Sequence, residues 1–470
     1  MRNRKESCLM KKPLTRREAL KAMGVFSAAG LVGGLTSGFS KTVLAGGRER
    51  RPNILFILTD DHRWDVLGAV GHPFIKTPNL DRLAAEGILF KNSFVTTSLC
   101  SPSRASFLTG QYAHHHGVIN NISPWNNDNV TFMELLKAGG YDTAFIGKWH
   151  MPGAFPKLRG LDKFVTFTIE KGQGRYWNCP LIERGVEVPS REPYITDELT
   201  RRALEYISGR HDQPFCLYLS LKAAHHNWSP PKETEGLYSE VEIRLPEEAD
   251  NMLGYANGNM LLGYLLPLEE VYRKYCRVIT SVDNHVGEIL KRLDDLGLAD
   301  NTIIVYAGDN GYLFGEHRKV DKREPHEESI RIPFLVRYPG FIPDPGRRAE
   351  QMVLNIDLAP SLLEVAGLPI PQNMDGESFL PILASKAAPS RKNWLYENFK
   401  DFPQRTPPLQ AVRTNRYIYI EYEDSRPFEL FDVVEDPREL RNMIGTAEGS
   451  RILPELKEQL RHLREGRRPS

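Results

Sequence analysis

Four short apolar runs, each ending in polar residues, constrain the fold of this chain more than any other feature. They are NILFILTDD, TAFIGKWH, FCLYLSLKAAHH and TIIVYAGDN, and they alternate with segments of helical pattern. This alternation predicts an α/β fold with a large, mostly parallel central sheet flanked by helices. Parallel strands point the same way, so their polar ends should converge on the carboxyl edge of the sheet, where such folds bind ligands.

Helix boundaries are marked by turn and capping residues. The segment TPNLDRLAAEG has Pro78 in its first turn and Gly87 at its end, which is typical of a helix. Thr131 and Glu134 have the spacing of a capping box at the start of TFMELLKAGG. A longer segment, YRKYCRVITSVDNHVGEILKRLDDLG, repeats apolar residues at the helical period and should stop at Gly297.

The 470 residues are enough for one large domain and a smaller one. We expect an export signal over residues 1–45, an α/β catalytic domain over 50–370 and a C-terminal subdomain over 371–470. In the last of these, QAVRTNRYIYIEYEDSRPFELFDVV predicts a small antiparallel sheet, and ILPELKEQLRHLREG predicts a terminal helix.

The first 45 residues have the pattern of a bacterial export signal. Basic residues precede a weakly apolar stretch, and small residues follow it. Arg16 and Arg17, followed by Leu20, resemble the twin-arginine type, whose export machinery passes folded proteins to the periplasm or beyond. The stretch VFSAAGLVGGLTSGF is too rich in glycine and serine to predict a stable membrane anchor.

Charge and cysteine content exclude some classes of function. The 61 basic and 60 acidic residues leave a formal charge of +1, so we expect no nucleic-acid partner. The five cysteines include no CxxC pair and no zinc-like spacing, so we expect no disulfide framework. Cys216 and Cys276 lie in apolar patterns and should be core residues.

The stretch TTSLCSPSRASFLTG places Cys100 directly before a predicted helix that ends at Gly110. The N–H groups at the start of that helix favour an anion, and Arg104 lies one turn on, on the same face. The residues between Cys100 and Arg104 are too few for the backbone loop of a thiol phosphatase. The pattern therefore predicts a cysteine placed for anion chemistry; the alternative is a buried thiol beside an exposed arginine.

The polar strand ends offer complementary chemical groups. Oxygen ligands suited to Ca²⁺ or Mg²⁺ come from Asp60, Asp61, Asp309 and Asn310. Arg104, Lys148 and a later lysine would hold an anion. His150 and His225 could move protons near neutral pH. Together these groups predict hydrolysis of an anionic ester, although an aspartate pair after a strand can also be a turn or a helix cap.

The segment CSPSRASFLTG resembles the signature of the type I sulfatases, in which the cysteine of Cys-x-Pro-x-Arg is oxidised to a formylglycine aldehyde. Other segments resemble the same family in the same order: RPNILFILTDDHRWDVLG, TPNLDRLAAEGILFKNSF, AFIGKWH, VYAGDNGYLFGEHRKVDKREPHEESIRIPFLVRYPG and LFDVVEDPREL. The resemblance covers residues 52 to about 445. It implies an alkaline-phosphatase-like fold, a sulfuric ester hydrolase and a maturation enzyme that generates the formylglycine.

The resemblance also implies a role for each matching residue. One Ca²⁺ would be bound by the modified Cys100 together with Asp60, Asp61, Asp309 and Asn310. Lys148 and Lys322 would grip the sulfate, and Arg104 would steady the hydrated aldehyde. His150 would serve a hydroxyl of the hydrate, and His225 would protonate the leaving alcohol.

In the implied mechanism, one hydroxyl of the hydrated aldehyde attacks sulfur and forms a covalent sulfate ester. The second hydroxyl then expels sulfate and regenerates the aldehyde, a step that an unmodified thiol could not perform.

One departure from the family pattern affects which lysine is assigned to the sulfate, Lys322 or Lys319. Arg318 stands where the family often has glycine, which leaves Lys319 as an alternative to Lys322, although the following DKREPHEESIRIP favours Lys322.

The segment SFLTGQYAHHHGVINN is similar to glucosamine-6-sulfatases of glycosaminoglycan breakdown, which favours 6-O-sulfated N-acetylglucosamine or a related glycan as substrate. Sulfates at other glycan positions and aryl or choline sulfates stay open. The loop residues that would contact a sugar are His114, His115, His116, Asn120, Asn121, Trp125, Trp177 and Trp228. Instead of contacting a sugar, the histidines could lie in a solvated loop, and the tryptophans could pack against the rest of the protein.

Two rival functions also stay open. A zinc phosphohydrolase of the same superfamily would share the sheet and the aspartates, but it would carry threonine or serine in place of Cys100. A protein that binds sulfated glycans without cleaving them would result if Cys100 stayed unmodified.

Overall fold

The computed structural model describes residues 51–152, 159–168, 172–209, 211–249, 252–255, 265–401 and 406–466. The predicted export signal, residues 1–45, lies outside these ranges. Within them, no helix is both long enough and apolar enough to cross a membrane.

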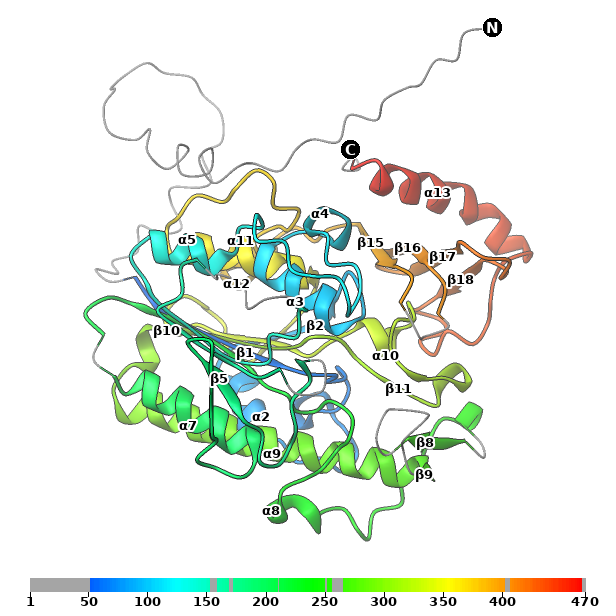
Figure 1. The fold of residues 1–470 in the computed structure, drawn as a ribbon. Coiled ribbons are helices and arrows are strands. Elements are labelled where there is room, and N and C mark those ends of the chain that lie inside the picture. Colours follow the sequence, from blue (N-terminus) through cyan, green and yellow to red (C-terminus); the bar gives the residue numbers. More distant parts are fainter. Residues whose placement is uncertain are drawn as a thin grey trace, which may run out of the picture.

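A central sheet, with ten strands in the described residues, runs through the molecule (Figure 1). From one edge to the other, its strands are β14 (Arg347–Leu354), β2 (Ile88–Phe94), β13 (Phe334–Arg337), β10 (Thr302–Gly308), β1 (Asn53–Thr59), β7 (Phe215–Ser220), β3 (Asp142–Gly147), β4 (Lys163–Thr166), β5 (Leu181–Glu183) and β6 (Val186–Val188). The parallel pairs are β14–β2, β10–β1, β1–β7, β7–β3 and β3–β4. The predicted α/β fold with a mostly parallel sheet is confirmed; β13 and β5 run against the other strands and make the sheet mixed.

The four apolar runs singled out in the sequence form adjacent parallel strands in the order β10, β1, β7, β3. At their carboxyl ends, Thr59 of β1 lies opposite Gly308 of β10, and Gly147 of β3 lies opposite Ser220 of β7. Every residue of β1, β7 and β10 is buried, as expected for strands covered on both faces. All four strands therefore end at the same edge of the sheet.

Helices cover both faces of the sheet (Figure 1). One face carries α3 (Cys100–Thr109), α4 (Ala113–His116), α5 (Phe132–Ala138), α11 (Leu358–Val365) and α12 (Leu380–Ala384). The other carries α2 (Pro78–Glu86), α7 (Ile195–Ile207) and α9 (Leu268–Asp295), and α8 (Lys232–Glu235) packs on α9. The predicted helix boundaries agree with the structure: the Thr131 hydroxyl accepts a hydrogen bond from the Glu134 N–H at 3.1 Å, and α3 ends before Gly110.

The central strands contribute to a separate apolar core on each face. Successive side chains of a strand point to opposite faces. Leu55 and Ile57 of β1 therefore pack in the core that contains α7 and α9. Ile54, Phe56 and Leu58 pack in the core that contains α3, α5 and α11.

A second, antiparallel sheet consists of β15 (Asn393–Asn398), β16 (Leu409–Thr414), β17 (Tyr417–Tyr422) and β18 (Glu429–Asp432), and α13 (Ala447–Arg464) packs on it. The predicted small sheet and terminal helix are thus present. Trp394 and Tyr396 of β15 share an apolar cluster with Phe94, Ile330 and Ile356, so the two sheets are joined by packing. The domain boundary at residue 370 stays a prediction.

Short elements complete the described part of the chain. They are α10 (Glu327–Ile330), β8 (Leu253–Tyr255), β9 (Leu265–Pro267), β11 (Leu313–Phe314), β12 (Val320–Asp321) and 3-10 turns at Gly68–Val70, Glu247–Ala249, Ala299–Asn301, Glu316–Arg318 and Asn355–Asp357. The hairpin β11–β12 leads directly into Lys322. The cysteines of the described residues are all buried and form no disulfide with one another, and Cys216 and Cys276 lie in the two cores as predicted.

Candidate active site

The acidic residues that follow β1 meet the polar residues that follow β10. Because β1 and β10 are adjacent, parallel and in register at their ends, Asp60 and Asp61 emerge beside Asp309 and Asn310. The Asp61 N–H donates to Asp309 Oδ1 at 2.9 Å, and Asn310 Nδ2 donates to Asp61 Oδ1 at 2.6 Å. One carboxylate oxygen from each of the three aspartates lies within 4.8 Å of the others.

Cys100 is the first residue of α3, and its thiol is fully buried among polar groups. Its Sγ lies 3.5 Å from Asp60 Oδ1 and 2.9 Å from Lys322 Nζ. Burial raises the pKa of the thiol to about 12, although Lys148 and Lys322 oppose this shift. The thiol therefore lies beside the aspartates rather than in apolar packing.

Arg104 links the ends of three strands. Its Nε donates to Asp309 Oδ2 at 2.9 Å, and its Nη1 donates to the Lys148 carbonyl oxygen at 3.1 Å. The same Nη1 donates to Ser220 Oγ, at the end of β7, at 2.6 Å. The side chain is buried, so the alternative of an exposed arginine beside the thiol is wrong.

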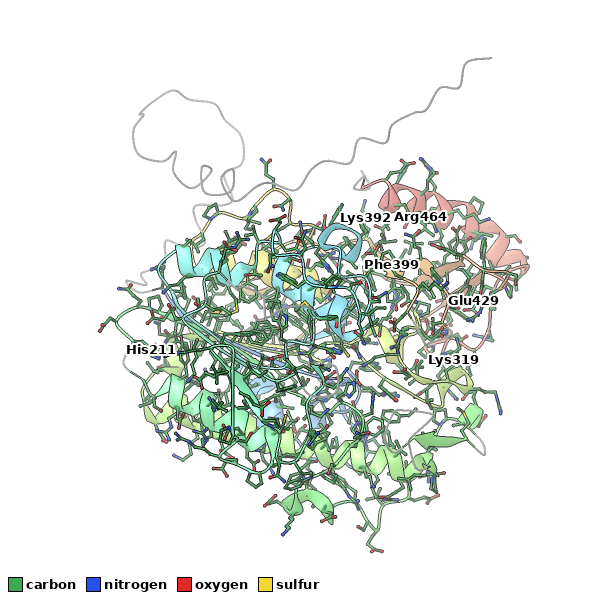
Figure 2. The ribbon with its side chains drawn as sticks, in the orientation of Figure 1. His211, Lys319, Lys392, Phe399, Glu429 and Arg464 are labelled. Atoms are coloured by element: carbon green, nitrogen blue, oxygen red, sulfur yellow. The ribbon has the colours of Figure 1, made fainter. Side chains whose placement is uncertain are left out.

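Two lysines bring positive charge to the carboxylates. Lys148 Nζ contacts Asp60 and also donates to Gln173 Oε1 at 2.6 Å. Lys322 Nζ contacts Asp61 as well as the Cys100 sulfur. Lys319, the alternative considered from the sequence, instead pairs with Glu324 at 2.8 Å and lies toward the rim of the molecule (Figure 2). Of the two candidate lysines, Lys322 is the one that enters the site.

Both predicted histidines lie at this edge and are buried. Nε2 of His150 lies 2.7 Å from Gln173 Nε2, and Nε2 of His225 lies 4.0 Å from Asp61 Oδ2. A ring nitrogen of His225 also lies within 4.8 Å of both the Cys100 sulfur and an Asp60 oxygen. Burial and the nearby lysines hold the pKa of both imidazoles well below the ordinary value, so each ring is neutral at neutral pH.

The electrostatic environment shifts the pKa values of Asp60 and Asp61 in opposite directions. Although burial disfavours any charged carboxylate, Lys148 and Arg104 hold the pKa of Asp60 well below its usual range. Burial raises the pKa of Asp61, and the neighbouring Asp60 and Asp309 raise it further. Three buried carboxylates in one place are costly unless cations neutralise them.

Two oxygen atoms of this group fit a cation. Within the described residues, Asp61 Oδ2 and Asn310 Oδ1 are buried and accept no hydrogen bond. Carboxylate and amide oxygens are ligands of hard cations such as Ca²⁺ and Mg²⁺. The residues present at the ends of β1 and β10 therefore suit an oxygen-liganded metal ion.

Three further side chains at the site were not singled out as functional from the sequence. Gln173 bridges Lys148 and His150, and Ser220 bonds Arg104. A ring nitrogen of His226 lies within 4.8 Å of ligand atoms of Asp61 and His225. Ser220 and His226 belong to a strand end whose polar residues signal the site, whereas Gln173 lies in a loop without periodicity.

The histidine run after α3 forms a short helix with specific partners rather than a solvated loop. Nδ1 of His114 lies 2.8 Å from Glu397 Oε2, and Nδ1 of His115 lies 2.8 Å from Asp375 Oδ2. His116 is buried, with Nε2 3.1 Å from Ser106 Oγ. These contacts give each of the three histidines a structural role.

The other predicted sugar contacts divide into packed and exposed residues. Trp228 is buried and donates from Nε1 to the Ala224 carbonyl, and Trp125 packs edge-on against Trp149. Asn120 Nδ2 donates to the Lys400 carbonyl oxygen at 3.0 Å. Asn121 Oδ1 accepts from the N–H of Ser101, next to Cys100, at 3.0 Å. Trp177 is 37% exposed and donates from Nε1 to Ser229 Oγ.

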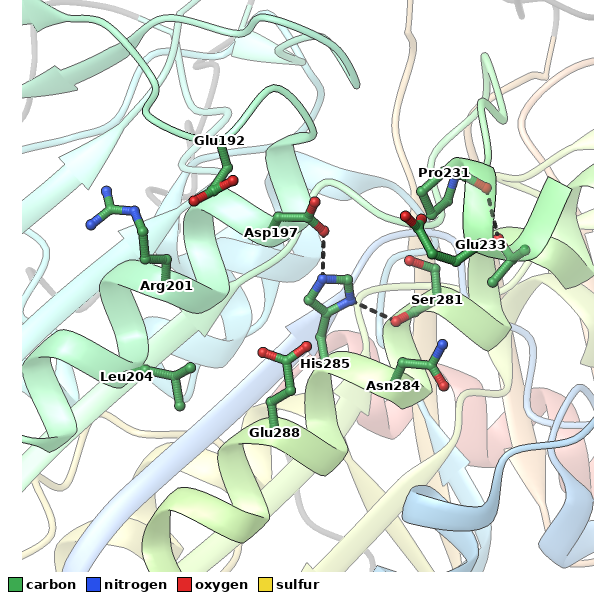
Figure 3. A pocket seen from close by; sticks show the side chains of 11 residues that line it. Glu192, Asp197, Arg201, Leu204, Pro231, Glu233, Ser281, Asn284, His285 and Glu288 are labelled. Atoms are coloured by element: carbon green, nitrogen blue, oxygen red, sulfur yellow. Dashed lines mark hydrogen bonds and ion pairs between the residues drawn. The ribbon is translucent and has the colours of Figure 1, made fainter.

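A pocket of about 420 Å³ lies between α7, α8 and α9, and none of the predicted site residues lines it (Figure 3). His285 lies across it, with Nε2 2.7 Å from Asp197 Oδ1 and Nδ1 2.6 Å from the Ser281 carbonyl oxygen. Four of the eleven lining residues are acidic: Glu192, Asp197, Glu233 and Glu288. The chemistry described above lies at the strand ends, not in this pocket.

Comparisons with known proteins identify the family. Residues 52–368 match the family model described as Sulfatase, and residues 315–466 match the one described as N-sulphoglucosamine sulphohydrolase, C-terminal. The N-acetylglucosamine-6-O-sulfatase of Bacteroides thetaiotaomicron is 30% identical over 483 aligned positions, which cover 87% of this chain and 86% of that protein. The ulvan-active sulfatase of Formosa agariphila is 31% identical, over 89% of this chain and 82% of that protein.

A solved structure supports the same relationship. It holds a protein in complex with its substrate D-glucosamine-2-N,6-O-disulfate, and it superposes with a TM-score of 0.81 at 29% identity. The superposition covers 88% of this chain and 98% of that one. Members of the sulfatase family use a formylglycine and a metal ion, and the acidic residues after β1 and β10 could bind such an ion. This chain therefore belongs to the sulfatase family and is a sulfuric ester hydrolase with an alkaline-phosphatase-like fold.

Proposed function

We propose that this protein removes sulfate from a sulfated carbohydrate, with 6-O-sulfated N-acetylglucosamine as its preferred substrate. The observation that carries the proposal is the placement of Cys100 at the start of α3, between Asp60 and Lys322. The substrate class is supported by the name of the Bacteroides relative and by the glucosamine disulfate bound in the solved structure.

We propose Ca²⁺ as the metal ion, held by Asp60, Asp61, Asp309 and Asn310 and by the modified residue 100. When bound, Ca²⁺ would polarise the oxygen atoms that it contacts as a Lewis acid. Lys148 and Lys322, which contact Asp60 and Asp61, would then turn their ammonium groups toward the sulfate oxygens.

Residue 100 is proposed to act as formylglycine rather than as cysteine. With its pKa raised to about 12 by burial, the Cys100 thiol forms little of the thiolate that nucleophilic attack requires at neutral pH. Formylglycine supplies an aldehyde that, once hydrated, has two hydroxyl groups on one carbon. Because the folded protein buries Cys100 completely, a formylglycine-generating enzyme would have to act before folding is complete.

Other side chains of the protein would bind, orient and protonate the substrate. Arg104 is held by Asp309 and Ser220, so it presents a fixed positive charge beside residue 100. His225 would donate a proton to the oxygen of the leaving alcohol, and His150 would accept one from a hydroxyl at residue 100. Burial is the main cause of the low pKa of His225, and the nearby lysines lower it further. A bound sulfate would offset the lysine charge and so favour the protonated ring.

Asn121 and Trp177 are the residues that we propose to contact the sugar. Asn121 accepts a hydrogen bond from the residue that follows Cys100. Trp177 has a partly exposed ring whose Nε1 donates to Ser229 Oγ at 2.8 Å, and it follows Tyr176, whose hydroxyl donates to the His225 carbonyl oxygen at 2.8 Å. An indole ring in such a position can pack on the apolar face of a pyranose.

The test is an assay of defined monosaccharide sulfates with the matured, calcium-loaded enzyme. N-Acetylglucosamine 6-sulfate should be cleaved at least tenfold faster than the 4-O-, 3-O-, 2-O- and N-sulfates, and Cys100→Ala should cleave none. Faster cleavage of another sulfate would reject the proposed substrate and keep the sulfatase. A phosphate diester cleaved faster than every sulfate would reject the proposed sulfate preference in favour of the phosphohydrolase alternative.

We also propose that the protein is exported through the twin-arginine pathway. The support is the pair Arg16–Arg17 ahead of the apolar stretch. Replacing both residues, Arg16→Lys and Arg17→Lys, should leave the protein in the cytoplasm, as measured by cell fractionation and sulfatase assay. Unchanged export of the double variant would contradict this pathway.

A further inference from the structure

Four polar side chains cluster where the β11–β12 hairpin meets α10 and the C-terminal sheet. None of them belongs to the set that surrounds Cys100. They are His317, His326, Glu328 and Glu439. The first three flank the segment that carries Lys322, and Glu439 comes from the chain after β18.

The ligand atoms of this cluster are close together but are not hydrogen-bonded. His326 Nδ1 lies 3.6 Å from Glu439 Oε2, and His317 Nε2 lies 3.9 Å from Glu328 Oε2. One ligand atom each of His317, His326 and Glu439 lies within 4.8 Å of the other two. The two imidazole rings stack with centroids 3.8 Å apart and planes 15° apart. Because an imidazole binds an ion in the plane of its ring, one of the two rings would turn out of this stack when both bind the same ion.

Four polar atoms of the cluster are buried without a hydrogen-bond partner among the described residues. They are His317 Nε2, His326 Nδ1, Glu328 Oε2 and Glu439 Oε1. The His326 and Glu439 side chains are only 2% and 0% exposed, so water does not solvate them freely. Buried polar atoms in native proteins are nearly always paired, and several unpaired atoms that face one another indicate a missing ligand.

We propose that this cluster is a second metal site, which binds one divalent transition-metal ion of the zinc type. His317, His326 and Glu439 would be its ligands, and Glu328 would be the fourth. Imidazole nitrogens suit zinc and its neighbours, whereas calcium and magnesium prefer oxygen alone. Two histidines with two carboxylates complete a four-coordinate zinc shell.

Metal binding would change the protonation of the carboxyl groups but not of the imidazoles. Burial raises the pKa of Glu439 to about 8 and holds that of Glu328 well above its ordinary value, so both would release a proton on binding the ion. Burial lowers the pKa of His326 to about 4 and that of His317 to about 3, so both rings are neutral and have a free lone pair at neutral pH. The Glu327 N–H donates to Glu439 Oε2 at 2.9 Å, which orients that carboxylate toward His326. Such outer contacts commonly orient metal ligands.

The site would join distant parts of the chain around a strained segment. His317, Arg318, Asp321 and Arg323 all have positive φ, a backbone conformation that L residues rarely adopt. One ion would hold both ends of this segment, through His317 and His326, and tie them to Glu439. It would therefore fix the segment that carries Lys322 against the C-terminal sheet.

The test is zinc binding by the untagged full-length protein in a background that removes the aspartate site. With Asp309→Asn and His225→Ala together as the background, which also removes the residue shared by the Asp60–Cys100–His225 and Asp61–His225–His226 groups, the protein is equilibrated with Zn²⁺, desalted and measured by inductively coupled plasma mass spectrometry. We expect about one zinc per chain. Adding His326→Gln or Glu439→Gln should lower the bound zinc at least tenfold. Adding His285→Gln, which removes another buried histidine that contacts a carboxylate, should leave it unchanged.

Two measurements keep the test decisive if a variant folds poorly. Zinc-edge X-ray absorption of the background protein, with Asp309→Asn and His225→Ala, should show nitrogen and oxygen ligands at about 2.0–2.1 Å with the outer-shell signal of imidazole. A hundredfold excess of Zn²⁺ over Kd should raise the Tm by roughly 3 °C. Less than a tenth of a zinc per chain, or equal zinc in the His326→Gln protein, would overturn the proposal.

Discussion

Residue 100 and its neighbours combine full burial with close polar contact. The sulfur of Cys100 contacts a carboxylate and an ammonium group. An ordinary core cysteine such as Cys216, by contrast, lies among apolar side chains. A buried thiol with a raised pKa is a poor nucleophile, which supports the proposal that the side chain is oxidised before use.

Cys100→Ala and Cys100→Ser should both abolish sulfate ester hydrolysis, with a loss of roughly 10³-fold or more in kcat. The expected reason is the absence of the aldehyde, not a change in fold, because both side chains are small enough for the site. Activity assays paired with circular dichroism and Tm would check this. Wild-type turnover in either variant, or residue 100 found as unmodified cysteine in fully active enzyme by peptide mass spectrometry, would contradict it.

Lys322 and Lys319 provide a matched pair for testing the sulfate contact. Lys322→Ala should lower kcat/KM by about 10²- to 10³-fold, because it removes a buried positive charge that faces residue 100. Lys319→Ala removes a partly exposed pair with Glu324 and should change kcat/KM less than about twofold. Steady-state kinetics on one sulfated substrate would decide; equal losses in the two variants would reject the assignment of Lys322.

At the level of secondary-structure elements, the site depends on strands that end side by side. The Lys148 N–H donates to the Ser220 carbonyl oxygen at 2.8 Å, which ties the end of β3 to the end of β7. Gly147, just before Lys148, has a φ of +120°. A Cβ at this position would collide with the Ser220 carbonyl oxygen, so only glycine fits.

Gly147→Ala should therefore lower the free energy of unfolding by about 2–4 kcal/mol, through overpacking and backbone strain. It should also reduce kcat, because Lys148 and the Arg104 contact to its carbonyl oxygen would shift. Denaturant unfolding and kinetics would measure both effects. Gly236→Ala, where a Cβ meets no atom within 4 Å, is the control and should be neutral. A Gly147→Ala protein as stable as the control would contradict the expected collision between the added Cβ and the Ser220 carbonyl oxygen.

For the whole molecule, the second sheet supports the site. The Tyr396 hydroxyl on β15 accepts from the Ser98 N–H at 3.3 Å and donates to the Arg323 carbonyl oxygen at 2.8 Å. The Arg323 N–H in turn donates to the Ser98 carbonyl oxygen at 3.0 Å. The segments that carry Cys100 and Lys322 are thus held together by a residue of the C-terminal sheet.

Tyr396→Phe should lower the free energy of unfolding by about 1–2 kcal/mol, because it leaves buried backbone groups without a partner. We expect kcat/KM to fall roughly tenfold as the two segments move apart. Tyr419→Phe, which removes a hydroxyl bonded to Glu421 in the same sheet, should leave kcat/KM unchanged. If both variants keep full kcat/KM, the C-terminal sheet does not position the site.

Removal of calcium should affect both activity and stability. A chelator should abolish turnover, because without the ion Asp60 and Asp61 would keep the two lysines that we propose to bind sulfate. Adding Ca²⁺ at a hundredfold excess over Kd should restore turnover and stabilise the fold by about 2.7 kcal/mol through mass action. Full activity after exhaustive chelation, with calcium shown absent by mass spectrometry, would contradict a calcium-dependent site.

Much of the candidate site could be predicted because its residues directly follow strands. Asp60, Asp309 and Lys148 stand next to apolar runs whose shared direction brings them together. Gln173 could not be predicted, because a loop without periodicity does not reveal where it lies. The partners of His114 and His115 are also invisible in the sequence, since Glu397 and Asp375 lie 283 and 260 residues farther along the chain.

The sequence by itself determined the alternation of strands and helices, the start of the helix at Cys100 and the chemical types gathered at one edge. These features depend on backbone geometry over a few residues, so a local pattern records them. The resemblance to the sulfatases favoured Lys322, but only the tertiary structure showed that Lys319 pairs with Glu324 instead, that His114 and His115 pair with distant carboxylates and that His317 and His326 meet Glu439. Those outcomes depend on how segments far apart in the chain pack together, and no local pattern encodes that packing.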